Sequence, residues 1–452
     1  MGAMISCMPP AARCLVAFVR SIGRWAMTAL IINCIIGSGI FGLPSELTRL
    51  VGRASPIAML VGALVMSVIM ACMAEVASQF SEAGGPYLYV RAAFGRFAAL
   101  QVGWFWLLAT IGGGAANANL FIGYLGGIWP WVGSGWGRAT VMALLIAIPT
   151  AANYRGARSG ANLSSVLTVA KLLPLLLLIA LGLVHFRHQA QVISATDVVR
   201  PGWAAWLSAL LLLIFPYGGY ENALAPTGEV KEPSRTIPFA LGAGLLICAV
   251  VYALVQFVTV ITIGANPTEH PLAETASLLI GRGGAVFVAV AVMISTYGWI
   301  SGNILNAPRI FYALAATGDA PARLAKLHPR FNTPALAIVV YAGLVWTLAA
   351  TGSYLWVLAL TAGSMMILYG GSCAALIRLR KLRPEAPALR VPFGPILAVI
   401  SVSISLVLLT RLKAQQVLLM VVTALLAAAN WWWAKRRAIN RATPKKAVAS
   451  QA

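Results

Sequence analysis

Two apolar stretches of this chain are interrupted near their centres by residues that disfavour helix. The first stretch contains Gly37-Ser38-Gly39, and the second contains Gly218-Gly219-Tyr220-Glu221. Glycine and serine are poor helix formers, and an interrupted helix leaves backbone N–H and C=O groups free to bind a ligand. Free amides at one break and free carbonyls at the other would suit a zwitterion, because its carboxylate needs donors and its ammonium needs acceptors. The alternative interpretation is close helix packing through small residues.

Two ionisable residues lie within apolar stretches of the chain. Lys171 lies in the apolar stretch 161–185, and Glu221 directly follows the second interruption. An ionisable side chain in such a setting is costly, and it is usually functional or paired. Lys171 therefore either exchanges a proton or acts as a permanently charged strut. Glu221 either senses protons or contacts a ligand, or it is a hydrogen-bonded strut.

The stretches that must position these residues are membrane helices. Of the 452 residues, 60% are hydrophobic and 10% are charged, whereas soluble domains carry about 25% charged residues. This composition excludes a soluble enzyme or a disordered binder. Because one crossing needs about 20 apolar residues, we predict an all-α polytopic membrane protein with twelve transmembrane helices, at about 25–45, 54–74, 97–128, 139–154, 161–185, 203–226, 236–264, 283–308, 333–351, 354–377, 391–410 and 414–434.

The charge pattern predicts the orientation of these helices. The chain has 33 Lys and Arg against 11 Asp and Glu, a net charge of +22. Lys and Arg collect in cytoplasmic loops, and most of them fall there if both termini are cytoplasmic. The excess of positive charge therefore predicts a multi-pass protein of the plasma (inner) membrane that contacts membrane lipid, rather than a partner of nucleic acid. Trp431-Trp432-Trp433 before Lys435 is typical of an inner interfacial belt.

The two interruptions lie in the first and the sixth predicted helix, and each opens a block of five helices. Corresponding interrupted helices in two halves are typical of transporters built from inverted repeats. The predicted organisation is a cytoplasmic N-terminal tail at 1–24, a first five-helix repeat at 25–185, a second, inverted repeat at 203–377, two further helices at 391–434 and a basic cytoplasmic tail at 435–452.

Four motifs carry a resemblance to a known family. They are Gly37-Ser38-Gly39-Ile40-Phe41, Glu82-Ala83-Gly84-Gly85-Pro86-Tyr87, Gly218-Gly219-Tyr220-Glu221 and Gly228-Glu229-Val230-Lys231-Glu232-Pro233. With them the chain resembles amino acid permeases of the amino acid–polyamine–organocation (APC) superfamily. The resemblance implies a LeuT-type 5+5 inverted repeat with helices 1 and 6 broken, which moves amino acids by alternating access.

The resemblance also implies a substrate site. The substrate carboxylate would lie on amides of the first break and the amino group on carbonyls of the second, with Phe215 and Trp299 as aromatic gates. Gly112-Gly113-Gly114 either leaves space for the substrate or packs closely. The residues expected to bind substrate are Ile36, Gly37, Ser38, Gly39, Phe215, Tyr217, Gly218, Gly219 and Trp299.

Lys171 and Glu221 are the residues expected to couple transport to protons. In proton-coupled members of the superfamily a lysine in the fifth helix resembles the sodium ion of sodium-coupled relatives, and Lys171 matches it. We expect its ammonium to bond to carbonyls freed near Gly37. For Glu75, which lies near Glu82 and Arg91 in sequence, we expect a structural ion pair with a cytoplasmic loop.

The predicted function is secondary active uptake of neutral amino acids, because the expected site offers little fixed side-chain charge. An amino acid or polyamine antiporter is the alternative, and a membrane-embedded transferase or a channel is more remote. We predict no enzyme activity, no catalytic residues, no metal and no cofactor beyond the proton as coupling ion. The sequence leaves the oligomeric state open.

Overall fold

The computed structural model describes residues 22–80, 85–155, 161–188, 201–224, 230–264, 268–316, 318–331, 333–384 and 389–442. These residues are helical or lie in short connections, apart from one isolated bridge between Ile22 and Val230. The predicted tails are described only at 22–24 and 435–442. The motif residues 82–84 and 228–229 also lie outside the described residues.

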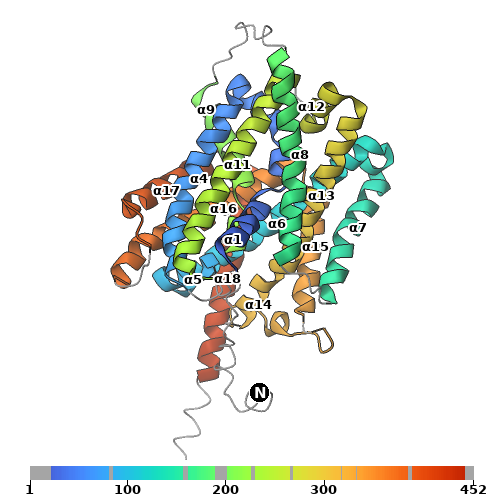
Figure 1. Cartoon of the computed structure of the whole chain (residues 1–452). Coiled ribbons are helices and arrows are strands. Elements are labelled where there is room, and N and C mark those ends of the chain that lie inside the picture. Colours follow the sequence, from blue (N-terminus) through green and yellow to red (C-terminus); the bar gives the residue numbers. More distant parts are fainter. Residues whose placement is uncertain are drawn as a thin grey trace, which may run out of the picture.

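The first half of the chain forms the helices around the first break (Figure 1). Their order is α1 Arg24–Ile35, α2 Gly39–Gly42, α3 Pro44–Val51, α4 Ser55–Ser78, α5 Gly85–Phe94, α6 Arg96–Ile128, α7 Gly135–Tyr154 and α8 Ala161–His188.

The second half begins with another interrupted pair and continues with helices of similar length. Their order is α9 Trp203–Tyr217, α10 Tyr220–Ala223, α11 Pro233–Ile263, α12 Pro271–Ile280, α13 Arg282–Asn306, α14 Pro308–Ala316, α15 Ala335–Thr351, α16 Tyr354–Leu382, α17 Gly394–Leu409 and α18 Ala414–Ala442.

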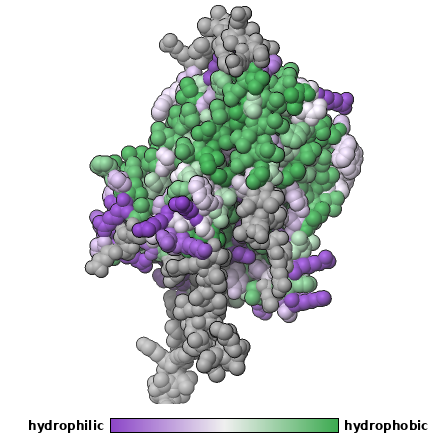
Figure 2. Space-filling view, viewed as in Figure 1, coloured by the Kyte–Doolittle hydropathy of each residue, from purple (hydrophilic) through white to green (hydrophobic). Residues whose placement is uncertain are grey.

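Ten segments of the described chain are long and apolar enough to cross a membrane. The apolar helices α12, α15 and α17 are shorter. Figure 2 shows a broad apolar surface, with hydrophilic side chains gathered toward the lower side of the view, where α5 and α14 lie in Figure 1. The protein is therefore an integral, multi-pass, helical membrane protein, whereas the count of twelve crossings stays a prediction.

The interior of the bundle is built on α6 and α16, which are its most buried spans. Helix α1 packs against α8 and α11, and α9 packs against α4 and α16. By contrast, α7 and α18 expose most of their apolar surface, as expected for helices that face lipid. The packing places both interrupted helices within the bundle, where irregular backbone is tolerated.

The last helix is longer than its apolar stretch. Helix α18 runs to Ala442, whereas the predicted crossing ends at 434. The backbone stays helical beyond the tryptophans, and the Lys435 amine lies 5.1 Å from the centre of the Trp431 ring. The beginning of the predicted basic tail is thus a continuation of α18.

Candidate functional site

The first break separates α1 from α2. Helix α1 ends at Ile35, Ile36 has extended backbone angles, and α2 begins at Gly39. Among the described residues, the amides of Gly37 and Ser38 donate no backbone hydrogen bond. The break therefore offers unpaired donors inside the bundle, where an unpaired backbone group is costly.

The second break lies against the first. Helix α9 ends at Tyr217 and α10 begins at Tyr220, with Gly219 between them at φ 93°, a conformation that favours glycine. A Cβ atom on Gly219 would lie 2.5 Å from the Cys34 carbonyl oxygen, and one on Gly39 would lie 2.6 Å from Cβ of Pro216. Glycine at these two positions therefore allows the breaks to touch.

Two tyrosines that the sequence reasoning missed bind carbonyls at the breaks. The Tyr252 hydroxyl on α11 lies 3.3 Å from the carbonyl oxygens of both Ile35 and Pro216. The Tyr354 hydroxyl donates to the Ser38 carbonyl at 3.0 Å. For Tyr252 the available signal was a tyrosine in the middle of an apolar stretch, because a buried hydroxyl needs a partner. Tyr354 begins its apolar stretch and gave no such signal.

Lys171 on α8 reaches the end of α1. Its Nζ donates to the carbonyl oxygens of Ile36 at 2.9 Å and Asn33 at 3.1 Å, and the residue is 1% exposed. No salt bridge to Lys171 occurs among the described residues. One turn earlier, Thr168 donates to the Ala29 carbonyl at 3.0 Å. A buried cation thus contacts the carbonyls that the end of α1 leaves available.

Glu221 binds the second break with one of its two oxygens. Its Oε2 accepts hydrogen bonds from the Gly219 amide at 3.0 Å and the Tyr369 hydroxyl at 2.8 Å. The ring of Tyr220 stacks on Tyr369. Oε1 is buried and has no hydrogen-bond partner among the described residues. The bonds of Oε2 fit the strut interpretation, and Oε1 remains available for a proton or a ligand.

The aromatic residues of the expected site lie at different places. The Trp299 ring lies beside Gly37 and Gly113, and a Cβ on them would be 3.2 and 2.5 Å from the ring. Phe215 lies against Gly39. Tyr217, however, donates to the Met59 carbonyl at 2.9 Å, so its side chain binds α4 while its backbone stays at the second break.

The three glycines of α6 pack closely in this structure. A Cβ atom on Gly112 would meet the Thr361 hydroxyl, and one on Gly114 would lie 3.0 Å from Val345. At the second break, Gly218 is similarly close to Met365, whose sulfur would lie 2.8 Å from a Cβ atom. These contacts favour the packing interpretation of the α6 glycines.

Glu75 forms a structural ion pair, but not with a neighbour in sequence. Its carboxylate binds Arg380 of α16 at 2.6 and 2.7 Å and accepts the Val391 amide at 2.8 Å. Arg91 instead contacts the Tyr87 hydroxyl at 3.4 Å. The partner was not predictable because α4 and α16 meet only in the folded bundle.

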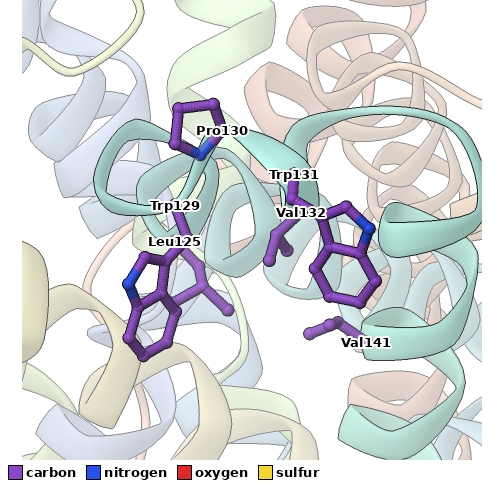
Figure 3. Close-up of a pocket in the computed structure, with 6 residues that line it drawn as sticks. All are labelled: Leu125, Trp129, Pro130, Trp131, Val132 and Val141. Carbon is purple, nitrogen blue, oxygen red and sulfur yellow. The ribbon is translucent and has the colours of Figure 1, made fainter.

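A separate apolar pocket of about 440 Å³ lies at the connection between α6 and α7. Figure 3 shows two tryptophan rings at its wall. None of the expected site residues lines it; its lining residues are Leu125, Trp129, Pro130, Trp131, Val132 and Val141.

The sequence of the chain matches a known protein family. A family model described as amino acid permease matches residues 22–439. The chain belongs to this family. Proteins that are similar to this chain are named as amino acid transporters or permeases.

Three proteins from Bacillus subtilis are similar to this chain over most of its length. The serine/threonine exchanger SteT is 26% identical over 405 residues, 85% of this chain and 89% of the relative. The branched-chain amino acid permease BcaP is 24% identical over 424 residues, 87% and 88% of the two chains. The glutamate/serine transporter AimA is 24% identical over 344 residues, 71% and 63% of the two chains.

Proposed function

We propose that this protein is a secondary active transporter that takes up neutral amino acids together with protons by alternating access. The observation that carries the proposal is the contact between the Lys171 ammonium and the carbonyls of Asn33 and Ile36 at the first break. The family membership supports amino acid transport. The two breaks in contact support a substrate site formed mainly by backbone groups.

The substrate binds between the two interrupted helices. Its carboxylate accepts hydrogen bonds from the amides of Gly37, Ser38 and Gly39, and its ammonium donates to carbonyls near Phe215, Tyr217 and Gly218. Ile36 and Gly219 complete the two breaks, and Phe215 and Trp299 close over the substrate. Because the substrate replaces missing backbone partners, its binding stabilises the contact between the first and the second break.

Lys171 couples this binding to the proton. As an ammonium it has three donors, and hydrogen bonds from a charged donor are about twice as strong as neutral ones. Protonation therefore strengthens the link between α8 and the end of α1. Loss of the proton weakens that link and releases α1, so that a proton gradient drives the cycle. Glu221 is the second proton-coupling residue, because its Oε1 has no described partner and can take up a proton.

A neutral substrate side chain is supported by the other residues at the breaks, since Lys171 and Glu221 bind backbone groups there. Gly37, Gly39, Phe215, Gly218 and Trp299 carry no charge. The names of two relatives, a serine/threonine exchanger and a branched-chain permease, support this class. Arginine, a polyamine or glutamate binding far more tightly than alanine, serine or leucine would contradict it.

The proposal includes the arrangement of the whole chain. Residues 25–185 and 203–377 form the two inverted repeats of a LeuT-type fold, and both termini are cytoplasmic at the inner membrane. The alternative function is exchange of amino acids or polyamines without net proton movement, which the name of the exchanger SteT favours.

Uptake by Lys171→Ala protein in proteoliposomes tests the coupling. We expect it to lose accumulation driven by an imposed pH gradient while exchange of internal for external substrate survives. The matched control is Thr168→Val, which removes a neighbouring bond from α8 to α1 without removing a titratable group, and it should keep accumulation. Proton-driven accumulation that is unchanged in Lys171→Ala protein contradicts the coupling role. Exchange alone in the wild type favours the alternative.

A further inference from the structure

An asparagine outside the expected site turns an unpaired oxygen toward the first break. Asn117 lies on α6, is fully buried, and donates from Nδ2 to the Gly113 carbonyl at 2.8 Å. A carbonyl can only accept, so this bond fixes which end of the amide is which. The opposite atom, Oδ1, lies 3.6 Å from the position of a Cβ on Gly37.

Oδ1 of Asn117 has no hydrogen-bond partner in the part of the chain that the structure describes. Leaving a buried acceptor unpaired is costly, and each such group needs an explanation. The same is true of the Ser38 hydroxyl in the break itself, which is buried and has no described partner. Two unsatisfied polar side chains thus lie at one break of the proposed substrate site.

The chemistry of the free atom limits what can occupy this place. An amide oxygen accepts a hydrogen bond and repels a carboxylate, so Oδ1 requires a donor. In the proposed site the substrate's ammonium already has acceptors at the second break. The remaining donor on a neutral amino acid is a group on its side chain, such as a hydroxyl. The Trp299 ring lies beside the same two glycines, 3.2 Å from a Cβ on Gly37 and 2.5 Å from a Cβ on Gly113.

We propose that Asn117 selects substrates whose side chain carries a hydroxyl group, by accepting its hydrogen bond at Oδ1. The inference rests on the proposed function, since it assumes that a neutral amino acid binds at the two breaks. It narrows that class from neutral amino acids to small hydroxylated ones. Asn117 is then a specificity-determining residue. The unpaired Ser38 hydroxyl in the first break is a second group that could bond to the substrate's hydroxyl.

Threonine and valine provide the sharpest comparison because they have nearly the same shape and differ by a hydroxyl and a methyl. A site built to bind a hydroxyl discriminates strongly against the analogue that lacks it, because its own polar group stays unpaired. We expect the wild-type protein to bind threonine roughly tenfold more tightly than valine. Serine and alanine should differ in the same direction.

The test measures binding of these four amino acids to purified full-length protein, by competition against a labelled substrate. In Asn117→Leu protein the ratio of threonine affinity to valine affinity should fall close to one, because threonine binds more weakly and valine more tightly. Asn117→Asp retains an oxygen acceptor and should keep a preference for threonine. The matched control is Thr110→Val on the same helix, whose hydroxyl donates to the Leu107 carbonyl of α6 at 2.9 Å, and it should keep the wild-type ratio of threonine to valine affinity.

Each outcome has a defined meaning. Equal weakening of threonine and valine in Asn117→Leu protein would assign Oδ1 to the ammonium and overturn the proposal, as would an unchanged ratio, which indicates a bound water. Wild-type protein that binds valine as tightly as threonine overturns it without any variant. If arginine, glutamate or a polyamine is the preferred ligand, the proposed function itself fails, which is a different result.

Discussion

Single residues decide how closely the two interrupted helices approach. A Cβ atom on Gly39 would lie 2.6 Å from Cβ and 2.9 Å from Cα of Pro216, so the backbone itself would have to move. The nearest atom to a Cβ on Gly37 is Cδ1 of Trp299 at 3.2 Å, which is a side-chain atom. The two glycines of one motif therefore tolerate a methyl group differently.

We expect Gly39→Ala to weaken substrate binding strongly and to lower stability by about 1–3 kcal/mol, the usual cost of overpacking. Gly37→Ala should remain close to the wild type in stability, because the Trp299 ring can shift by a few tenths of an ångström. Thermal unfolding in detergent and substrate binding check both effects. Gly39→Ala protein with wild-type affinity would show that the breaks need not touch.

His270, in the connection before α12, gives stability a dependence on pH. Its ring lies 4.6 Å from that of Tyr124, and burial lowers its pKa although Glu269 opposes the shift. The unfolded chain has a histidine pKa of about 6.5. As pH falls through that value, the unfolded chain binds the proton first, so stability decreases toward the lower folded pKa. Above about pH 6.5 the histidine is neutral in both the folded and the unfolded chain, and its contribution does not change with pH.

Unfolding temperatures measured between about pH 5 and pH 8 check this dependence. The wild type should lose stability on the acid side of about pH 6.5, and His270→Gln protein should lose less over the same interval. The comparison removes contributions that both proteins share. An identical acid slope in the two proteins would assign the loss to other groups.

At the scale of elements, polar side chains tie helices together at points where apolar packing alone has no preferred register. The Tyr252 hydroxyl contacts the carbonyls of Ile35 and Pro216, in the last turns before the two breaks. Glu75 joins α4 to α16 and to the segment before α17. Glu75 is fully buried, and the Arg380 side chain is 22% exposed. Such a pair is costly to break from one side.

Glu75→Gln should lower the free energy of unfolding by about 3 kcal/mol, the lower end for a broken buried pair, because Arg380 is partly exposed. The matched control is Glu46→Gln, which breaks the ion pair with the largely exposed Arg49 and should cost less than about 1 kcal/mol. Thermal unfolding of the purified proteins compares the two. If both variants lose the same small amount of unfolding free energy, the ion pair between Glu75 and Arg380 contributes little to stability.

At the scale of the whole molecule, the distribution of charge predicts the orientation in the membrane. Most Lys and Arg fall on the side to which the predicted cytoplasmic loops belong, including Lys435 and Arg436 on α18. Trp136, at the start of α7, is 88% exposed and lies in a predicted outer connection. The positive-inside rule then places these two regions on opposite sides.

A membrane-impermeant maleimide tests this orientation on intact cells. Trp136→Cys protein should react directly, and Lys435→Cys protein should react only after the membrane is opened. The unsubstituted chain, with its six native cysteines, measures the background. The opposite pattern of labelling would reverse the proposed topology and place both termini outside.

The sequence by itself determined the features that depend on local composition. Long apolar stretches predict membrane helices, and Gly37-Ser38-Gly39 and Gly218-Gly219 predict their interruptions, because helix propensity and hydropathy act over neighbouring residues. The lysine at position 171 was equally visible, because a charge inside an apolar stretch needs no structure to be noticed. The closeness of the α6 glycines to neighbouring helices was left open.

Only the tertiary structure decided which groups meet. The carbonyls of Asn33 and Ile36 bind Lys171, and Glu75 pairs with Arg380 rather than with Arg91. Asn117 gains its importance only because α6 packs beside the first break. Partners of this kind lie far apart in sequence, and their choice depends on how whole helices pack. The packing of the whole bundle decides which buried polar groups find partners, so no single stretch of sequence contains this information.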